Sequence, residues 1–410
     1  MATTSATTSP TNTGRSWPTG WPNAWVSDDA AYPRFSHAEF ARRHASIRQI
    51  MESSSLQAVL IFGNRAAHNE IQYLTNFAVA FEGMLLFPAK DEMVLWVNYV
   101  NHQETARAVS IVDDIRWGGD DVAETAAAEL NLRGLDSARI GLAGPLTHLR
   151  WLALRRLCPE AELVDIQPML ARQRLVKSDE EIAWARRGAE LSDLAIAALA
   201  RDARPGLTEH DLAAIVQAAY YPFGGRTHIH YIGATPMRAP ALCAPAQIQS
   251  SRRLVAGDVI LTELSAMHHG YWGQVLRCFA VAGDPTPEFL RMHEVAEAVF
   301  SALAGELRDG TTSDELLDIA EGIHQAGYTI YDDLVHMAVG GVYAPYLRTR
   351  RTTEDMAPAF TYRKNMLVVL QPNVVTEDRR AGVQVGEMVR VTTSGVERLH
   401  RLPLEFIRCG

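Results

Sequence analysis

Two side chains in the second half of this sequence have the chemistry for proton transfer. Glu263 stands in the apolar run VILTELSAM, and His336 stands in the apolar, glycine-bounded run LVHMAVGG. A buried carboxylate is costly unless it is paired or protonated, and the pKa of histidine lies near neutrality. Each of the two is therefore a candidate general acid or base of an active site. The alternatives are a structural ion pair between Glu263 and Arg277, and a core histidine bonded to the backbone.

Two glutamines and an arginine-rich run offer groups that would hold a polar substrate. Gln274 and Gln371 each present a hydrogen-bond donor and an acceptor, which suits an amide, a guanidine or a carboxylate. In YLRTRR (346–351), Arg348 and Arg350 are spaced so that both can face one way and bind a carboxylate. The alternatives are remnants of an inactive site for the glutamines and a solvated charge run for the arginines.

A pair of histidines, His228 and His230, stands in THIHY on a predicted strand. Side chains two residues apart on a regular strand point to the same side. We therefore expect both to face one way and to converge on a ligand. The alternative is a pair of solvated or stacked histidines.

Composition indicates a soluble enzyme rather than a nucleic-acid or membrane protein. The formal charge of -9 gives no basic footprint, and no apolar run approaches the ~18 residues needed to cross a bilayer. The first residues also lack the pattern of a signal peptide, so we expect a cytoplasmic protein. The cysteines form no CxxC pair, and Cys243 has no base motif beside it, so we expect reduced thiols.

The order of predicted elements indicates two domains. A helix over 35–55 precedes short apolar strands at 58–62, 71–77, 84–88 and 93–97, and further helices alternate with strands up to residue 166. A capping box, Ser178 with Glu181, begins a long helix after the boundary near Pro168. Since residues 1–20 are rich in Thr, Ser, Pro and Gly, we predict a disordered tail at 1–24. The domains then span 25–170 and 171–410.

Three stretches together resemble the family of creatinase, prolidase and aminopeptidase P. They are RQRLVKSDEEIAWARRGAELS (172–192), VAGDVILTELSAMHHGYWGQVLRCFAVAG (255–283) and VERLHRLP (396–403). With the α/β first domain, the resemblance covers roughly residues 35–405. It implies an α/β fold class, in which a creatinase-like N-terminal α/β domain precedes a C-terminal pita-bread α+β domain. It also implies a homodimer.

The resemblance bears directly on metal binding, because peptidases of this family hold two divalent metals through Asp, Asp, His, Glu and Glu. Matched by register, these five positions are Glu263, Gln274, His336, Gln371 and Gly386. Neutral amides are poor substitutes for carboxylates, and the two glutamines remove two of the four negative charges that would offset the metals. Glu387 could replace a ligand only if its strand slipped by one residue, which would turn its side chain to the other face. We predict no metal and no cofactor.

Two further positions come from the resemblance alone. Tyr343 stands where the family has a second active-site histidine, and a further family histidine has no counterpart, with Cys243 nearest. Phe81, in YLTNFAVAF, resembles a segment that reaches the active site of the partner in creatinase-like dimers. The alternative for Phe81 is an ordinary core aromatic residue.

Creatinase works without a metal, and this precedent fits the residues best. We predict a metal-independent, creatinase-like enzyme that cleaves a C–N bond of a small polar nitrogen-containing substrate, by hydrolysis or a related elimination. Gln274, Gln371 and Arg277 would orient the substrate and water. One alternative is a metal-dependent Xaa-Pro dipeptidase or aminopeptidase with altered ligands. Another is a non-catalytic pita-bread module that binds a peptide or partner.

Overall fold

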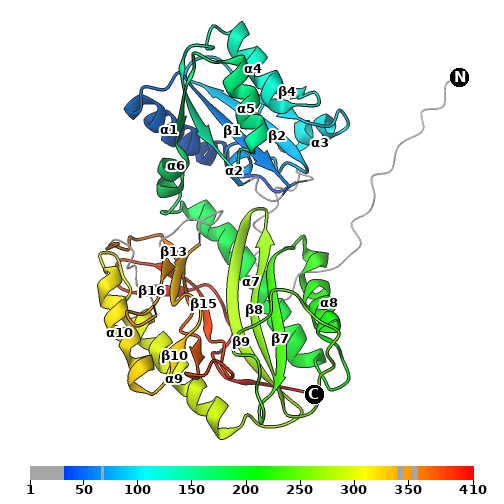
Figure 1. The fold of residues 1–410 in the computed structure, drawn as a ribbon, viewed down its shortest axis with the longest axis vertical. Helices are drawn as coiled ribbons and strands as arrows, with labels where there is room; N and C mark the ends of the chain where they lie inside the picture. The colour runs from blue at the N-terminus through cyan, green and yellow to red at the C-terminus, as the bar shows by residue number, and fades with distance from the viewer. Residues whose placement is uncertain (1–31, 66–68, 339–345, 353–358) are drawn as a thin grey trace, which may run out of the picture. The chain divides into compact units, whose positions relative to one another are not determined.

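The computed structural model describes residues 32–65, 69–338, 346–352 and 359–410 (Figure 1). Within it, Phe35–Gly410 form one compact unit. The predicted tail at 1–24 and Tyr343 lie outside the described residues. No helix in the described part is long and apolar enough to cross a bilayer.

The first part of the chain builds a six-stranded mixed sheet in the order β4-β3-β2-β1-β5-β6. Central strand β1 pairs antiparallel with β2 and parallel with β5. Its alternate residues enter two cores: Val59 and Ile61 pack with α1, α2, α3 and α6, whereas Leu60 and Phe62 pack with α4 and α5. The elements are α1 His37–Ser53, β1 Ala58–Asn64, α2 Asn69–Thr75, β2 Glu82–Pro88, β3 Val94–Val97, α3 His102–Val109, β4 Asp114–Trp117, α4 Val122–Leu132, β5 Arg139–Ala143, α5 His148–Leu157, β6 Glu162–Asp165 and α6 Gln167–Gln173.

One predicted strand of this domain is wrong. The segment 71–77 lies largely in helix α2, where Ile71 and Leu74 are fully buried on one side. The Thr75 hydroxyl donates to the Ile71 carbonyl oxygen at 2.7 Å, a bond made within one helical turn. The β-branched and aromatic residues of the segment favour a strand. Ile71 and Leu74, which are three residues apart, pack against β1 from one side of a helix, and this packing outweighs the strand preference.

The second part builds a nine-stranded sheet in the order β12-β11-β13-β15-β9-β8-β7, with β16 added to β15 and β17 added to β9. Helices α7 and α8 cover one face near β7, β8 and β9, and α9 and α10 pack on another core (Figure 1). The fold class predicted from sequence is confirmed. The elements are α7 Asp179–Asp202, α8 Glu209–Tyr220, β7 Arg226–Pro236, β8 Asp258–His268, β9 Tyr271–Val281, α9 Pro287–Glu306, α10 Ser313–Gln325, β10 Thr329–Ile330, β11 Val335–Met337, β12 Tyr346–Leu347, β13 Leu367–Leu370, β14 Val374–Val375, β15 Gly386–Val391, β16 Val396–Arg398 and β17 Ile407–Cys409.

Helix α7 fixes the start of β9 by close approach of backbones. The predicted capping box of Ser178 and Glu181 is present at its first turn. Further along, a Cβ atom placed on Gly273 would lie 2.3 Å from the Ala189 backbone, and one on Gly188 would lie 2.7 Å from the Tyr271 carbonyl oxygen. Glycine is therefore required at both positions, because a side chain at either one would clash with the backbone of the facing element. The residues that flank Gly273 on β9 are therefore held firmly.

Candidate active site

A chain of side-chain hydrogen bonds joins three of the predicted site residues. Gln274 on β9 donates through Nε2 to Glu263 Oε1 on β8 and to Gln371 Oε1 just after β13, at 2.9 Å each. Gln371 Nε2 in turn donates to the Asp333 carbonyl oxygen at 3.0 Å. Both glutamines are at least 95% buried. The structure therefore brings Glu263, Gln274 and Gln371 together as one bonded group.

The strand register explains why these residues meet. Glu263 pairs with Leu276 and Ser265 pairs with Gln274, so Glu263 and Gln274 extend from the same face of the sheet. His336 on β11 pairs with Val369 on β13, two residues before Gln371. His336 therefore extends from the same face as Gln371. Glu263 is thus bonded to the two glutamines, and His336 lies on the same face of the sheet as Gln371.

An aromatic group borders this chain. The Trp272 ring stacks on His228, with centroids 5.0 Å apart and planes within 9°. Its centroid lies 6.2 Å from that of His336, and the Tyr346 ring lies 6.4 Å from His336 on another side. His228 therefore belongs to the neighbourhood of His336.

His230 does not belong to it, which corrects the expectation that the two histidines face one way. A register shift in the β7–β8 pairing falls between Thr227 and Ile229, so the regular alternation is broken at His228. His230 points to α8 instead, where its Nε2 lies 2.8 Å from the Tyr220 hydroxyl. The spacing of the two histidines in the sequence does not show whether a β-bulge interrupts the strand, so the bulge could not be predicted.

Arg277 is also misplaced by the sequence interpretation. It pairs with Thr262, so it extends from the face opposite to Glu263. There it is fully buried, donates to Glu387 Oε2 at 2.7 Å and to the Gly386 carbonyl oxygen at 2.8 Å. Neither the substrate-orienting role nor the alternative ion pair with Glu263 agrees with this geometry. Arg277 is part of a buried structural ion pair.

Two further candidates, Arg348 and Phe81, have other surroundings. Arg348 Nε is 3.5 Å from Asp333 Oδ1, and Arg348 lines a cavity of about 760 Å³ together with Asp332, Arg351 and Arg379. Phe81 is half exposed and packs against Tyr99 and His102 in the first domain. No contact recorded within the described ranges joins Phe81 to the Glu263 cluster of the same chain.

The environment raises or lowers the pKa of each titratable group in this cluster. Burial raises the pKa of Glu263 to about 8, with further contributions from the charges of Asp332 and Asp333. Burial likewise raises the pKa of Asp332 to about 7, against a bond from Asn373 that lowers it. Burial lowers the pKa of His336. At neutral pH the cluster therefore contains a protonated Glu263 and a neutral His336.

Sequence reasoning missed Asp332. Its Oδ2 accepts a bond from Asn373 Nδ2 at 3.0 Å, while its Oδ1 is buried and has no protein partner among the described residues. The signal was present as two adjacent aspartates in YDDLVHM, four and three residues before His336. A buried carboxyl oxygen without a partner is uncommon and marks a place where a ligand or water binds.

The comparisons with known proteins agree with this fold. Residues 183–393, more than half of the chain, match the model of metallopeptidase family M24, and residues 43–176 match the creatinase/prolidase N-terminal domain. The chain belongs to this family. It is similar to a Xaa-Pro dipeptidase of Pyrococcus horikoshii, with 23% identity over 88% of this chain and 97% of the relative. It is equally similar to a creatinase of a Bacillus species, with 23% identity over 90% of this chain and 92% of the relative.

A solved structure has the same fold. The prolidase from Pyrococcus horikoshii superposes with a TM-score of 0.74 at 19% identity, covering 89% of this chain and all of that protein. The resemblance stated from sequence is confirmed, and so is the prediction of a hydrolase of this family that acts on C–N bonds. The requirement for a metal and the identity of the substrate are finer questions.

Family M24 implies a dimetal centre, and the residues present do not fit one. A Cβ atom on Gly386 would lie 2.5 Å from the Leu370 carbonyl oxygen, so no carboxylate side chain fits at the fifth ligand position. Glu387, beside it, is fully buried and bonded to Arg277 and Arg398. In the part of the chain that the structure describes, no group of three or more His, Cys, Asp or Glu residues is arranged to hold a metal ion.

Proposed function

We propose that this chain is a metal-independent hydrolase that cleaves a C–N bond in a small polar substrate containing nitrogen. The observation that carries the proposal is the bonded chain of Glu263, Gln274 and Gln371, with His336 beside it. These residues stand where metallopeptidases of the family have metal ligands. The similarity to a creatinase over nearly the whole chain adds support.

The protonation states assign the two roles in the reaction. Neutral His336 takes a proton from a water molecule as the water oxygen attacks the carbon of the C–N bond. Protonated Glu263 passes its proton to the nitrogen as that bond breaks, and Gln274 and Gln371 hold the polar atoms of the substrate in place. The proton on His336 then returns to Glu263 through solvent. Each turnover consumes one water molecule and releases an amine.

The cavity beside Asp332 supports a small substrate that carries a carboxylate. Three arginines, Arg348, Arg351 and Arg379, line it with Asp332 and Glu377. Arg348 also contacts Asp333 at 3.5 Å and Arg351 pairs with Glu321 at 2.9 Å. Guanidinium groups bind carboxylates with paired hydrogen bonds. A substrate anchored there would place its nitrogen-containing end toward Asp332 and Glu263.

The first test combines metal analysis with a search for substrates. Purified protein would be analysed by mass spectrometry for bound transition metals, and treated with chelator before assay. Amine release would be followed with creatine-like amidines, ureas and N-substituted amino acids, using Glu263→Gln and His336→Ala as inactive variants. Turnover that survives chelation and disappears in both variants supports the proposal. Turnover of Xaa-Pro dipeptides that depends on added metal would overturn it.

We propose in addition that the enzyme is a cytoplasmic homodimer with a domain boundary near residue 170. The half-exposed ring of Phe81, with Tyr99 beside it, offers an apolar contact that supports a dimer. Light scattering on the purified protein and on Phe81→Ser would test this. A monomeric wild type, or a variant with the same dimer dissociation constant, would count against this role for Phe81.

A further inference from the structure

The start of β9, which carries Trp272 and Gln274 of the candidate site, is held from its other face by Tyr271. Successive side chains of a strand point to opposite faces, so Tyr271 extends toward α7 while Trp272 extends toward the acid/base group. The Tyr271 hydroxyl donates to Glu181 Oε1 on α7 at 2.8 Å and accepts a bond from Arg43 Nη2 on α1 at 3.1 Å. Tyr271 therefore connects the start of β9 to a helix of each domain.

Arg43 is the residue through which the first domain reaches this tyrosine. It is almost fully buried, and its Nε donates to Glu39 Oε1 at 2.7 Å while its Nη1 donates to the Tyr73 carbonyl oxygen at 2.8 Å. The guanidinium also lies over the rings of Phe35 and Tyr73, at 4.0 and 4.4 Å from their centroids. A planar guanidinium enclosed in this way has a fixed orientation, so its Nη2 defines where the Tyr271 hydroxyl lies.

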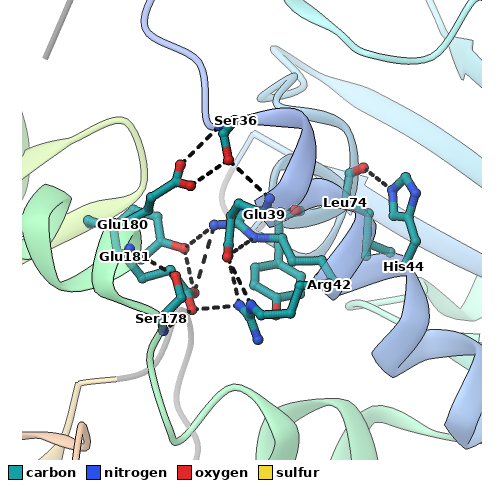
Figure 2. Close-up of polar contacts among 11 residues, drawn as sticks. Ser36, Glu39, Arg42, His44, Leu74, Ser178, Glu180 and Glu181 are labelled. Atoms are coloured by element: carbon teal, nitrogen blue, oxygen red, sulfur yellow. Dashed lines mark hydrogen bonds and ion pairs between the residues drawn. The ribbon is translucent and has the colours of Figure 1, made fainter.

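The two helices that present these partners are also bonded to each other, as Figure 2 shows. Ser36, which caps the N-terminus of α1, donates through its backbone N–H to Glu180 Oε2 on α7 at 2.9 Å. Arg42 on α1 donates through Nη2 to Glu181 Oε2 at 2.8 Å. The carboxylate that accepts from Tyr271 is therefore bonded to α1 as well, and α1, α7 and β9 form one connected group.

A displacement of Tyr271 would reach the site side of β9. Trp272, the next residue, stacks on His228, and Gln274 makes the two bonds that join the candidate site. Between them, Gly273 lies so close to the backbone of α7 that no Cβ atom fits. Because closely packed segments transmit strain and hydrogen bonds weaken steeply with misalignment, the strand has little freedom to absorb such a displacement.

We propose that Arg43, in the first domain, is a positioning residue for the active site and that it acts through the Tyr271 hydroxyl. A fixed hydroxyl holds the start of β9, and β9 in turn holds the Trp272 indole on His228 and the Gln274 amide between its two partners. The catalytic consequence rests on the proposed function, whereas the placement of the indole is a property of the fold. Loss of the hydroxyl should therefore displace the indole even in the absence of substrate.

Tyr271→Phe removes the hydroxyl and leaves the contact between the domains in place. Glu181 still accepts from the Ser178 backbone N–H at 2.9 Å and from Arg42 at 2.8 Å. Arg43 keeps its two other hydrogen bonds and both aromatic contacts. The variant is therefore expected to fold, with a lower thermal midpoint than the wild type.

The direct test is the NMR signal of the His228 ring in protein labelled at histidine, measured at one pH. The ring current of Trp272 shifts this signal upfield in the wild type, and His228→Gln identifies it by its loss. In Tyr271→Phe the signal is expected to move toward the position of an unstacked imidazole. Tyr362→Phe, at a buried tyrosine of the core that packs on α9 and α10, should leave it in place. An unmoved signal in Tyr271→Phe would overturn the proposal.

A double-substitution cycle tests whether Arg43 acts through the hydroxyl. Arg43→Lys keeps the positive charge beside Glu39 and loses the planar fork, so it should move the His228 signal on its own and have no further effect in Tyr271→Phe. Equal shifts in both backgrounds would refute the proposal. With a substrate in hand, both single variants should lower kcat roughly 10–100-fold with little change in KM, and an unchanged kcat would contradict the positioning role. The NMR measurement needs no turnover, so a failure of the proposed hydrolase is distinguishable from a failure of this inference.

Discussion

Replacing Glu263 by glutamine should make the protein less sensitive to alkaline pH. Burial raises the pKa of Glu263 from its ordinary value of 4.5 to about 8, so the folded state binds a proton that the unfolded state releases between these values. Stability therefore falls as pH rises through this window, and the effect is absent below about pH 4.5. Glutamine has nearly the same shape and cannot lose this proton.

The expected difference is large enough to measure. Each pH unit in the window costs about 1.4 kcal/mol of unfolding free energy, which amounts to about 4 kcal/mol by pH 8. Glu263→Gln should then resemble the wild type near pH 5 and exceed its stability by up to about this amount near pH 8. Asp332, whose pKa is also raised, contributes to the pH dependence of both proteins and so affects their difference less.

Urea unfolding followed by circular dichroism at several pH values would measure this difference. The exposed Glu160→Gln serves as a control for the loss of one negative charge. Wild type and Glu263→Gln should diverge steadily with rising pH, while Glu160→Gln should follow the wild type. If the wild-type and Glu263→Gln curves stay parallel, Glu263 ionises normally in the folded protein, and its role as the acid in the reaction fails.

Three further outcomes follow from the geometry. Arg277→Met should destabilise the fold by about 3–5 kcal/mol because it removes one of the two guanidinium partners of the buried Glu387, and adding Glu387→Gln should recover part of this loss in chemical unfolding. Gln274→Leu should cost about 1–3 kcal/mol by the same measurement, since Glu263 and Gln371 each lose a bond. His336→Ala should lower kcat by about 10²–10⁴-fold with little change in the unfolding midpoint, and an unchanged kcat would remove His336 from the mechanism.

Sequence patterns predicted the fold well because they report on local energetics. The capping box of Ser178 and Glu181 and the runs at β1, β8 and β9 determine both element type and position. The resemblance matched Glu263 and Gln274 to one set of ligand positions, and the β8–β9 hairpin does bring their side chains to one face of the sheet. These features depend only on residues that are close in the sequence or on the pairing of two consecutive strands, so they could be predicted.

The incorrect or missing predictions have a different origin. Each depends on contacts between residues that are distant in the sequence. His230 was misplaced because of a β-bulge, and Arg277, which was predicted to orient the substrate, extends from the face of the sheet opposite to Glu263. Asp332 is held by Asn373, and the two residues meet because Asp332 follows β10 and Asn373 directly precedes β14, the strand that pairs with β10. Spacing along one segment carries no information about such contacts.

The neutral glutamines Gln274 and Gln371 and the raised pKa of Glu263 have one electrostatic explanation. A dimetal centre requires ionised carboxylates, and the metal charge keeps them ionised. With Gln274 and Gln371 in place, that positive charge is not required, and the burial of Glu263 near Asp332 and Asp333 then favours its protonated form. Restoring both carboxylates alone should not restore a metallopeptidase, because the Leu370 carbonyl oxygen occupies the space that a side chain at residue 386 would need. A double substitution, Gln274→Asp with Gln371→Glu, is therefore expected to place three acids together without a complete ligand set, and to destabilise the protein above neutral pH rather than to create peptidase activity.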